Sequence, residues 1–173
     1  MEYRQLGRSG LTVSAVGLGC NNFGGQPVNA PSGTVYGLMS VEDTRAVVDA
    51  AFDAGITLFD TADVYGGGGS EEQLGKILKD RRHQVVLATK WGSGMENRRD
   101  IAWGSRRYIR QACEASLRRL DTDYIDLYQM HWQCPRTPIE ETIAALVAAL
   151  TPLPAPPSIE RRDEEPIPER DRL

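Results

Sequence analysis

Residues 56–90, ITLFDTADVYGGGGSEEQLGKILKDRRHQVVLATK, contain the pattern that decides the fold of this 173-residue chain. The short apolar run 56–59 has the length of a buried strand, and the run 85–88 predicts another. Between them a helix is expected to begin at Ser70, with its apolar face formed by Leu74, Ile77 and Leu78. A strand, a helix and a strand in this order are typical of a parallel pair joined by a right-handed crossover.

The same alternation continues toward the N-terminus. Residues 3–6 and 11–14 flank a Gly-Arg-Ser-Gly turn and predict a hairpin, and residues 15–19 predict a first buried strand. After a loop rich in Gly, Pro and Asn, Ser40 opens a capping box at the start of a helix. That helix is expected to end before Gly55, and its predicted apolar face is Val47, Val48, Ala51 and Phe52.

Two further units follow toward the C-terminus. Ser105 is expected to cap a helix whose apolar face is Ile109, Cys113, Leu117 and Leu120. Residues 124–128 predict a fourth strand, and Thr137-Pro138 starts a fourth helix whose predicted face is Ile143, Leu146, Val147 and Leu150. Four such units in series predict an α/β fold with a parallel sheet. Periodicity alone leaves open whether the sheet is doubly wound or part of a (β/α)8 barrel.

The chain is expected to divide near residue 150. Residues 1–150 carry the alternating pattern and form one predicted domain. Residues 151–173 contain six of the ten prolines and ten charged residues, without an aromatic side chain or any regular apolar spacing. Such a segment buries too little apolar surface to offset the entropy lost on ordering, so the sequence predicts a disordered tail.

The overall composition excludes several classes of protein. The net charge is −4 and no basic face is evident, so we expect no nucleic-acid partner. There is no run of 18 apolar residues and no signal-peptide pattern, so we expect no association with a membrane. Cys20, Cys113 and Cys134 are too far apart to predict a metal pair or a disulfide framework. A cytoplasmic protein without a metal site is the expectation.

Four polar side chains follow the predicted strands at the points where those strands end. Asp60 and Tyr65 come after the second strand, Lys90 after the third and His131 after the fourth. Each alone has an ordinary structural explanation, as a turn cap, a rim aromatic, a surface lysine or a hydrogen-bonded core histidine. Parallel strands of an α/β fold bring such ends to one edge, so the four together predict a single site.

These four residue types make chemical sense as a group. A phenol with an ordinary pKa near 10 rarely gives up its proton near neutrality, and a nearby ammonium group favours the phenolate. A carboxylate holds that ammonium in place, and a neutral imidazole donates a hydrogen bond to a carbonyl oxygen. The arrangement suits protonation of an oxygen on which charge develops. The missing reactant is a nucleophile directed at carbon, which a hydride cofactor supplies.

The motifs around these residues resemble those of the aldo-keto reductase family. Gly55-Ile-Thr-Leu-Phe-Asp-Thr-Ala-Asp-Val-Tyr-Gly66 followed by Ser70-Glu-Glu-Gln-Leu-Gly75 is similar to the family signature. The segments 88–92, 116–131 and 137–142 continue the resemblance in order, so that it covers residues 1 to about 146. The resemblance implies a (β/α)8 barrel closed at the bottom by the N-terminal hairpin, of which this chain carries the hairpin and about four strand–helix units.

The resemblance also implies roles for individual residues. Tyr65 matches the proton donor, Asp60 and Lys90 match the pair that tunes it, and His131 matches the residue that orients the carbonyl group. The implied cofactor is NADPH, bound without a Rossmann motif, with Cys20, Asn21, Gln26 and Asp60 near its nicotinamide-ribose end. The implied activity is the NADP-dependent reduction of a small aldehyde or ketone.

The family pattern stops at about Val147, which predicts a C-terminally truncated member, and a frameshift is one hypothesis for its origin. We therefore expect little reductase activity from this chain alone, and self-association through the open edges of a half barrel. The alternatives are an inactive fragment, or a regulatory protein resembling the cytoplasmic subunits of potassium channels. His131 argues against the second alternative, because those subunits carry an amide residue at the matching position.

Overall fold

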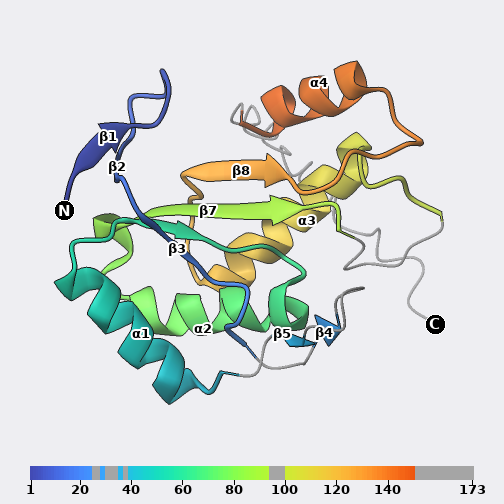
Figure 1. Cartoon of the computed structure of the whole chain (residues 1–173). Coiled ribbons are helices and arrows are strands. Elements are labelled where there is room, and N and C mark those ends of the chain that lie inside the picture. The colour runs from blue at the N-terminus through green and yellow to red at the C-terminus, as the bar shows by residue number, and fades with distance from the viewer. Residues whose placement is uncertain (25–27, 30–34, 37–38, 94–99, 151–173) are drawn as a thin grey trace, which may run out of the picture.

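The computed structural model describes residues 1–24, 28–29, 35–36, 39–93 and 100–150. The predicted disordered tail, 151–173, and the predicted cofactor contact Gln26 both lie outside the described residues. Figure 1 shows a sheet with helices α1 (Val41–Asp53), α2 (Gly69–Leu78) and α3 (Arg106–Leu120) along one side and α4 (Ile139–Leu150) beyond strand β8 (Leu127–Met130).

The central sheet has four parallel strands in the order β3-β6-β7-β8. Their bounds are Gly17–Gly19, Leu58–Asp60, Val86–Trp91 and Leu127–Met130. The α-helices α1, α2, α3 and α4 span Val41–Asp53, Gly69–Leu78, Arg106–Leu120 and Ile139–Leu150. Two 3-10 helices, η1 (Tyr65–Gly68) and η2 (Arg82–Gln84), precede α2 and β7. The alternation predicted from the sequence is confirmed.

The N-terminal hairpin is also confirmed and is attached to the sheet at the N-terminal end of β6. Strands β1 (Tyr3–Gln5) and β2 (Thr12–Ser14) pair antiparallel. The Ser14 hydroxyl accepts the backbone N–H of Thr57 at 2.9 Å, and the Thr57 hydroxyl accepts the N–H of Ser14 at 3.0 Å. This reciprocal pair holds the hairpin against the start of β6. Strands β4 (Val28–Asn29) and β5 (Val35–Tyr36) also pair antiparallel.

Two of the helix starts follow the predicted caps, and a third does not. The hydroxyl of Ser40 accepts the N–H of Asp43, and that of Ser105 accepts the N–H of Tyr108. The expectation that Ser70 begins α2 is wrong, because the helix starts at Gly69 after an N-cap glycine without a side-chain cap. The Ser70 hydroxyl instead donates to the backbone oxygen of Cys20 at 2.8 Å. Its hydrogen bond therefore ties α2 to the segment after β3.

The glycine-rich turn before α2 packs backbone against backbone. Gly66, Gly67 and Gly68 all adopt positive φ angles, a region that residues with a Cβ rarely enter. A Cβ built on Gly24 would lie 2.2 Å from the carbonyl carbon of Gly69. The loop after β3 can approach the start of α2 this closely only because Gly24 has no Cβ.

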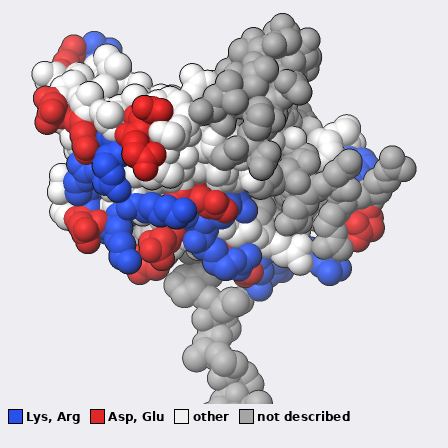
Figure 2. Space-filling view, turned by 90° about the horizontal axis from the view of Figure 1, so that it is seen from below, with Lys and Arg blue, Asp and Glu red and all other residues white. Residues whose placement is uncertain are grey.

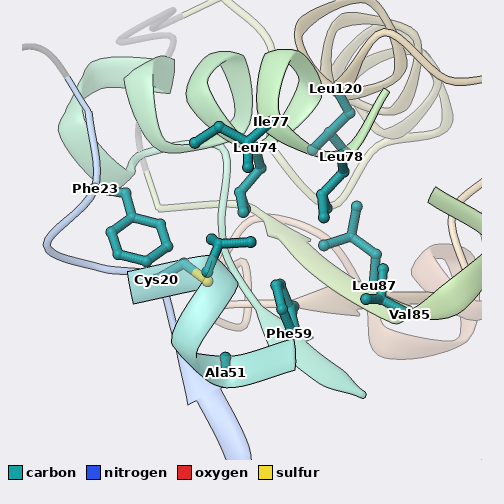
Figure 3. Close-up of a cluster of buried hydrophobic side chains, with 11 residues drawn as sticks. Cys20, Phe23, Ala51, Phe59, Leu74, Ile77, Leu78, Val85, Leu87 and Leu120 are labelled. Carbon is teal, nitrogen blue, oxygen red and sulfur yellow. The ribbon is translucent and has the colours of Figure 1, made fainter. Parts of the chain in front are cut away.

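The main apolar core lies between the sheet and helices α1 and α2. Phe59 and Leu87 extend from β6 and β7 against a set of apolar side chains that includes Val48, Leu74, Ile77, Leu78 and Leu120 (Figure 3). Phe59, Leu87, Val48 and Leu74 are completely buried. Burying a side chain of this size contributes on the order of 2 kcal/mol to folding. A second cluster around Trp91, Tyr108 and Ile109 joins α3 and α4 to β7.

The residues of β7 alternate between the two faces of the sheet. Leu87, Thr89 and Trp91 are completely buried, and Leu87 packs against the core that α2 covers. Thr89 donates to Glu71 of α2, whereas Lys90 pairs with Asp60 at the opposite face. One short strand therefore contributes to the helix-covered core and to the inner face at the same time.

Two predictions about burial and strand bounds are wrong. The first strand is not buried, because β3 lies at the edge of the sheet and both its glycines are exposed. The fourth strand begins at Leu127 rather than at 124, since the carboxylate of Asp126 accepts the N–H of Leu87 at 2.9 Å. That side chain also pairs with Arg82 at 2.7 Å, so it occupies the place of a backbone ladder bond.

The apolar faces of α3 and α4 differ in part from their predictions. In α3, Ile109 and Leu120 are buried as predicted, whereas Cys113 and Leu117 are only partly buried. The buried residues of α3 are Tyr108, Ile109, Ala112, Ser116 and Leu120. Helices α2 and α3 approach each other closely, because a Cβ on Gly75 would lie 2.7 Å from the carbonyl oxygen of Arg119. In α4, Thr142 and Ala145 are buried, whereas Ile143 and Val147 are 52% and 60% exposed. The hydroxyl of Thr142 donates to Gly104 O at 3.0 Å, which sets the side that α4 turns inward.

The surface carries charges of both signs. Seen from below the sheet, Lys and Arg side chains form a band with Asp and Glu beside it (Figure 2). A shallow depression in the molecular surface is lined by residues that include Lys79, Arg82, Arg118, Asp121 and Asp123. Within the residues that the structure describes, there is no helix both long enough and apolar enough to span a membrane.

Candidate active site

The structure brings the four predicted catalytic residues together at the carboxyl edge of the sheet. Asp60 is the last residue of β6, Lys90 lies near the end of β7, and His131 directly follows β8. Tyr65 is the first residue of η1, five positions after Asp60. The backbone N–H of His131 donates to Trp91 O at 2.8 Å, which fixes the segment after β8 to its neighbour. Convergence of the strand ends, as predicted, is confirmed.

Lys90 is held by two oxygen atoms. Its Nζ lies 2.8 Å from Asp60 Oδ1 and donates to the backbone oxygen of Thr61 at 2.8 Å. The Lys90 side chain is 14% exposed and that of Asp60 is 43% exposed, so the pair lies at the mouth rather than in the core. Two acceptors on one strand end therefore fix the ammonium group in position.

Lys90 and His131 both contact the ring of Tyr65. The Lys90 Nζ lies 5.1 Å from the centroid of that ring, within the range of a cation–π contact. The imidazole of His131 meets the ring edge to face, with centroids 5.7 Å apart and an angle of 88°. The backbone N–H of Tyr65 donates to Ala62 O at 3.2 Å, and glycines in left-handed conformations follow directly. The ring therefore lies between a cation and an imidazole.

His131 is in an environment that favours its neutral form. Partial burial, and then the positive charge of Lys90, lower the pKa of this imidazole, although Asp60 opposes the shift. Its Nδ1 atom is buried, and no partner for it exists among the described residues. The ring stacks on Trp132, with centroids 6.0 Å apart and an angle of 12°. A neutral imidazole has one N–H to donate, which suits a bond to a carbonyl oxygen.

The residues predicted to touch a cofactor occupy different environments. Cys20 is completely buried in the main core, with its thiol turned among apolar side chains (Figure 3). Burial, and then the charge of Asp60, raise the pKa of this thiol well above its usual range. Asn21, the next residue, is partly exposed, and Asp60 lies at the mouth beside Lys90. The predicted cofactor contacts of Cys20, Asn21, Gln26 and Asp60 stay predictions.

A buried polar cluster behind the mouth was not anticipated from the sequence. Glu71 is completely buried and accepts bonds from Thr89 Oγ1 and Arg119 Nε, both at 2.6 Å. Asp63, which is 2% exposed, accepts the hydroxyl of Ser93 at 3.2 Å. Burial, and then the charge of Glu71, raise the pKa of Asp63 to about 6. The even–odd alternation along β7 is the only sequence signal that would have placed Thr89 on this side.

The described residues contain no group of three His, Cys, Asp or Glu side chains that could hold a metal ion. Asp60, Lys90, Tyr65 and His131 bring a carboxylate, an ammonium group, a phenol and an imidazole to the mouth. Together they can bind and protonate an oxygen atom.

Comparison with known proteins places this geometry in a family. Residues 15–150 match the model of the Aldo/keto reductase family. The chain is 43% identical over 144 residues to the aldo-keto reductase YhdN of Bacillus subtilis, covering 82% of this chain and 41% of the relative. It is 41% identical over 150 residues to the uncharacterized oxidoreductase YqkF of the same organism, covering 84% of this chain and 44% of the relative.

A solved structure agrees with these matches. The aldo-keto reductase AKR11C1 from Bacillus halodurans, in its holo form, superimposes with a TM-score of 0.70 at 41% identity. The match covers 86% of this chain and 46% of that one. The chain belongs to the aldo/keto reductase family, and its sheet and helices form part of a (β/α)8 barrel. It spans less than half the length of these relatives.

Proposed function

We propose that the residues at the mouth serve the reduction of an aldehyde or ketone by NADPH, with Tyr65 as the proton donor. The observation that carries the proposal is the position of the Tyr65 ring, 5.1 Å from the Lys90 ammonium group and 5.7 Å from the His131 imidazole. Membership of the aldo/keto reductase family supports the same reaction class.

Each residue has a role that its surroundings support. The Lys90 ammonium group favours negative charge on the Tyr65 oxygen when its proton leaves, and Asp60 holds that ammonium group in place. The neutral imidazole of His131 donates to the substrate carbonyl oxygen and orients it. As charge develops on that oxygen, the proton passes to it from the Tyr65 hydroxyl. The product is an alcohol, and the phenolate regains a proton from solvent.

The residues present fit a nicotinamide cofactor at the mouth. When bound, NADPH supplies the hydride that reaches the carbonyl carbon. Asp60 and Asn21 are the exposed or partly exposed polar residues of the predicted contact set within the described residues. The buried Nδ1 of His131, which lacks a partner among the described residues, also leaves a polar atom available at this site. NADPH in preference to NADH is part of the proposal.

The test uses this chain and a chimera. Residues 1–146 are joined to the C-terminal portion of the B. subtilis relative YhdN, which supplies the remaining length of the family. We expect the chimera to oxidise NADPH in the presence of a small aromatic aldehyde. We expect the chain alone to show little activity and weak quenching of Trp91, Trp103 and Trp132 by NADPH.

Variants assign the chemistry to Tyr65. Tyr65→Phe in the chimera should lower kcat by about a hundredfold or more, since general acid catalysis contributes that order of rate. Tyr124→Phe is the matched control, because Tyr124 contacts Arg82 on another part of the molecule. A chimera that keeps full activity with Tyr65→Phe would contradict the proposed role.

A further inference from the structure

Asp63 lies between the two segments that carry Tyr65 and Lys90. Its backbone N–H donates to Lys90 O at 3.0 Å, which extends the pairing of β6 and β7 beyond the end of β6. Tyr65 follows two residues later. The side chain of Asp63 accepts the hydroxyl of Ser93, three residues after Lys90. Its backbone and its carboxyl group therefore both connect the turn before Tyr65 to the segment that begins at Lys90.

The surroundings of the Asp63 carboxyl group are crowded with charge. From α2 it faces Glu71, and from α3 it faces Arg119, which is itself engaged by Glu71 at 2.6 Å. From β8 the phenol of Tyr128 lies within its electrostatic reach, and that hydroxyl is buried with no hydrogen-bond partner among the described residues. From the segment after β7 comes the Ser93 hydroxyl. Two buried carboxyl groups thus face one arginine.

The Asp63 carboxyl group accepts the Ser93 hydroxyl and the backbone N–H of Val64, and the bond from Ser93 differs in strength between the two forms of the carboxyl group. A carboxylate accepts a hydroxyl in a charge-assisted bond that is about twice as strong as one between neutral groups. A protonated carboxyl group keeps an acceptor oxygen but loses that assistance. The carboxyl group also loses its repulsion from Glu71 when it binds a proton. The connection between the two segments therefore differs between the two forms.

We propose that Asp63 is a positioning residue of the candidate site: its carboxyl group, through Ser93, sets where the Tyr65 ring lies relative to Lys90 and His131, and sets it differently in its two protonation states. Its bearing on catalysis rests on the proposed function of Tyr65. The displacement of the ring is a property of the chain itself and is measured without turnover.

The experiment follows the Tyr65 ring by NMR in the full chain, with ¹³C-labelled tyrosine rings and aspartate carboxyl groups. We expect the Asp63 carboxyl signal to titrate with a midpoint near 6. The Tyr65 ring signals should move with the same midpoint. His131 also titrates in contact with this ring, so its own ring signal is recorded in the same samples and its midpoint is separated from that of Asp63.

Two variants and a control decide the outcome. Asp63→Asn should remove the Asp63 transition from the Tyr65 signals and leave them near their low-pH positions at every pH. Ser93→Ala should raise the midpoint, because the hydroxyl that stabilises the carboxylate is lost. Asp49→Asn, which alters an exposed carboxylate of α1 that pairs with Arg81, should leave the transition unchanged. If Asp63→Asn does not fold, the Ser93→Ala titration still provides the test.

The inference is overturned if the Tyr65 signals follow only the His131 midpoint, or if neither variant alters their response. Its failure is distinct from failure of the proposed function. An unresponsive ring together with a chimera that requires Tyr65 would remove the role of Asp63 alone. A responsive ring together with a chimera indifferent to Tyr65→Phe would leave the positioning intact and remove the proposed chemistry.

Discussion

The Nζ atom of Lys90 lies 2.8 Å from Oδ1 of Asp60, its neighbour across two parallel strands of the sheet. The same ammonium group donates to Thr61 O at 2.8 Å, so the lysine has two fixed acceptors on one strand end. Besides these two acceptors, the ammonium group of Lys90 contacts the ring of Tyr65. The charges of Lys90 and Asp60 both act on the pKa of His131, so that pKa can be used to follow the pair.

Removing the charge of Asp60 and removing the charge of Lys90 should move the pKa of His131 in opposite directions. Lys90 lowers this pKa and Asp60 raises it. Asp60→Asn is therefore expected to lower the pKa further, and Lys90→Met is expected to raise it. The chain contains two histidines, so the ring signals of His131 and His83 are readily separated by NMR. Lys79→Met serves as the control, and shifts of the same sign in both test variants would contradict this electrostatic account.

Asp63 should make the chain more stable in mild acid than at neutrality. Its folded pKa, about 6, lies above 3.8, the ordinary pKa of an aspartate side chain, so the folded state binds the proton more tightly than the unfolded state. Stability therefore falls as the pH rises from about 4 through 6 and then levels off, with an upper limit of about 3 kcal/mol. Urea unfolding of the wild type and of Asp63→Asn at several pH values tests this. The difference in unfolding free energy between the two proteins should change across that window, and a constant difference would contradict the prediction.

Protonation of His131 should lower the stability of the fold, whereas protonation of Asp63 should raise it, and the two pH ranges are neighbours. Its folded pKa lies below 6.5, so the folded state resists protonation and stability is lost as the pH falls below that value. Comparing Asp63→Asn with and without His131→Gln separates the two contributions. In the Asp63→Asn background, the remaining decline between pH 6.5 and 5 should weaken when His131 is replaced.

The buried pair of Glu71 and Arg119 should be sensitive to the loss of its arginine. Arg119→Met leaves a completely buried carboxylate with only the Thr89 hydroxyl, at an expected cost of about 3–5 kcal/mol. It should also raise the pKa of Asp63, because Arg119 lowers that pKa, whereas Glu71→Gln should lower it. Arg118→Met, at the exposed neighbouring position on α3, should change unfolding free energy by less than about 0.5 kcal/mol. Equal effects of the two arginine variants would count against the buried pair.

Gly24 and Gly10 separate backbone strain from steric overlap. Both adopt positive φ angles, but a Cβ on Gly10 meets nothing within 4 Å, whereas one on Gly24 lies 2.2 Å from the backbone of Gly69. Gly10→Ala should cost about 1–2 kcal/mol from conformation alone. Gly24→Ala should cost clearly more or prevent folding, since two backbone segments must separate. Thermal unfolding of both variants provides the comparison, and similar losses would mean that the loop relaxes freely.

The outer face of α4 is expected to promote self-association. Ile139, Ile143 and Val147 are spaced by one helical turn and are 38%, 52% and 60% exposed. Ile143→Glu should therefore shift sedimentation toward the monomer without lowering stability. Ala145→Glu, at a buried position on the same helix, should destabilise the fold instead. Association that is unchanged by Ile143→Glu would place the contact elsewhere, such as at the edge strands β3 and β8.

The sequence predicts the order of the strands and helices better than it predicts which side of each helix faces the core. Asp60, Tyr65, Lys90 and His131 converge as expected because parallel strands end at one edge, a rule that needs only the sequence of elements. The inward side of α3 depends on how closely Gly75 allows α2 to approach, and the inward side of α4 depends on a bond from Thr142 to Gly104. Neither contact is visible in the periodicity of one helix.

The buried polar cluster escaped prediction for a related reason. Glu71 belongs to a run of helix-start acids that would ordinarily be solvated. Only the packing of α2 against α3 brings Arg119 to it, across 48 positions of sequence. The raised pKa of Asp63 could not be predicted either, because it arises first from burial and then from the nearby charge of Glu71.

Side chains alternate between the two faces of β7, so the register of this one strand determines which residue enters the core and which reaches the mouth. Thr89 belongs to the helix side, where it satisfies a carboxylate, and Lys90 belongs to the mouth, where it meets Asp60. Loss of a single residue between Val86 and Thr89 would exchange their sides, since the side-chain period of a strand is two. The lysine would then enter the core beside Glu71, and the mouth would hold a neutral hydroxyl in its place. The length of this short strand is thus more constrained than the identity of its residues, and its tolerance of substitution should far exceed its tolerance of insertion or deletion.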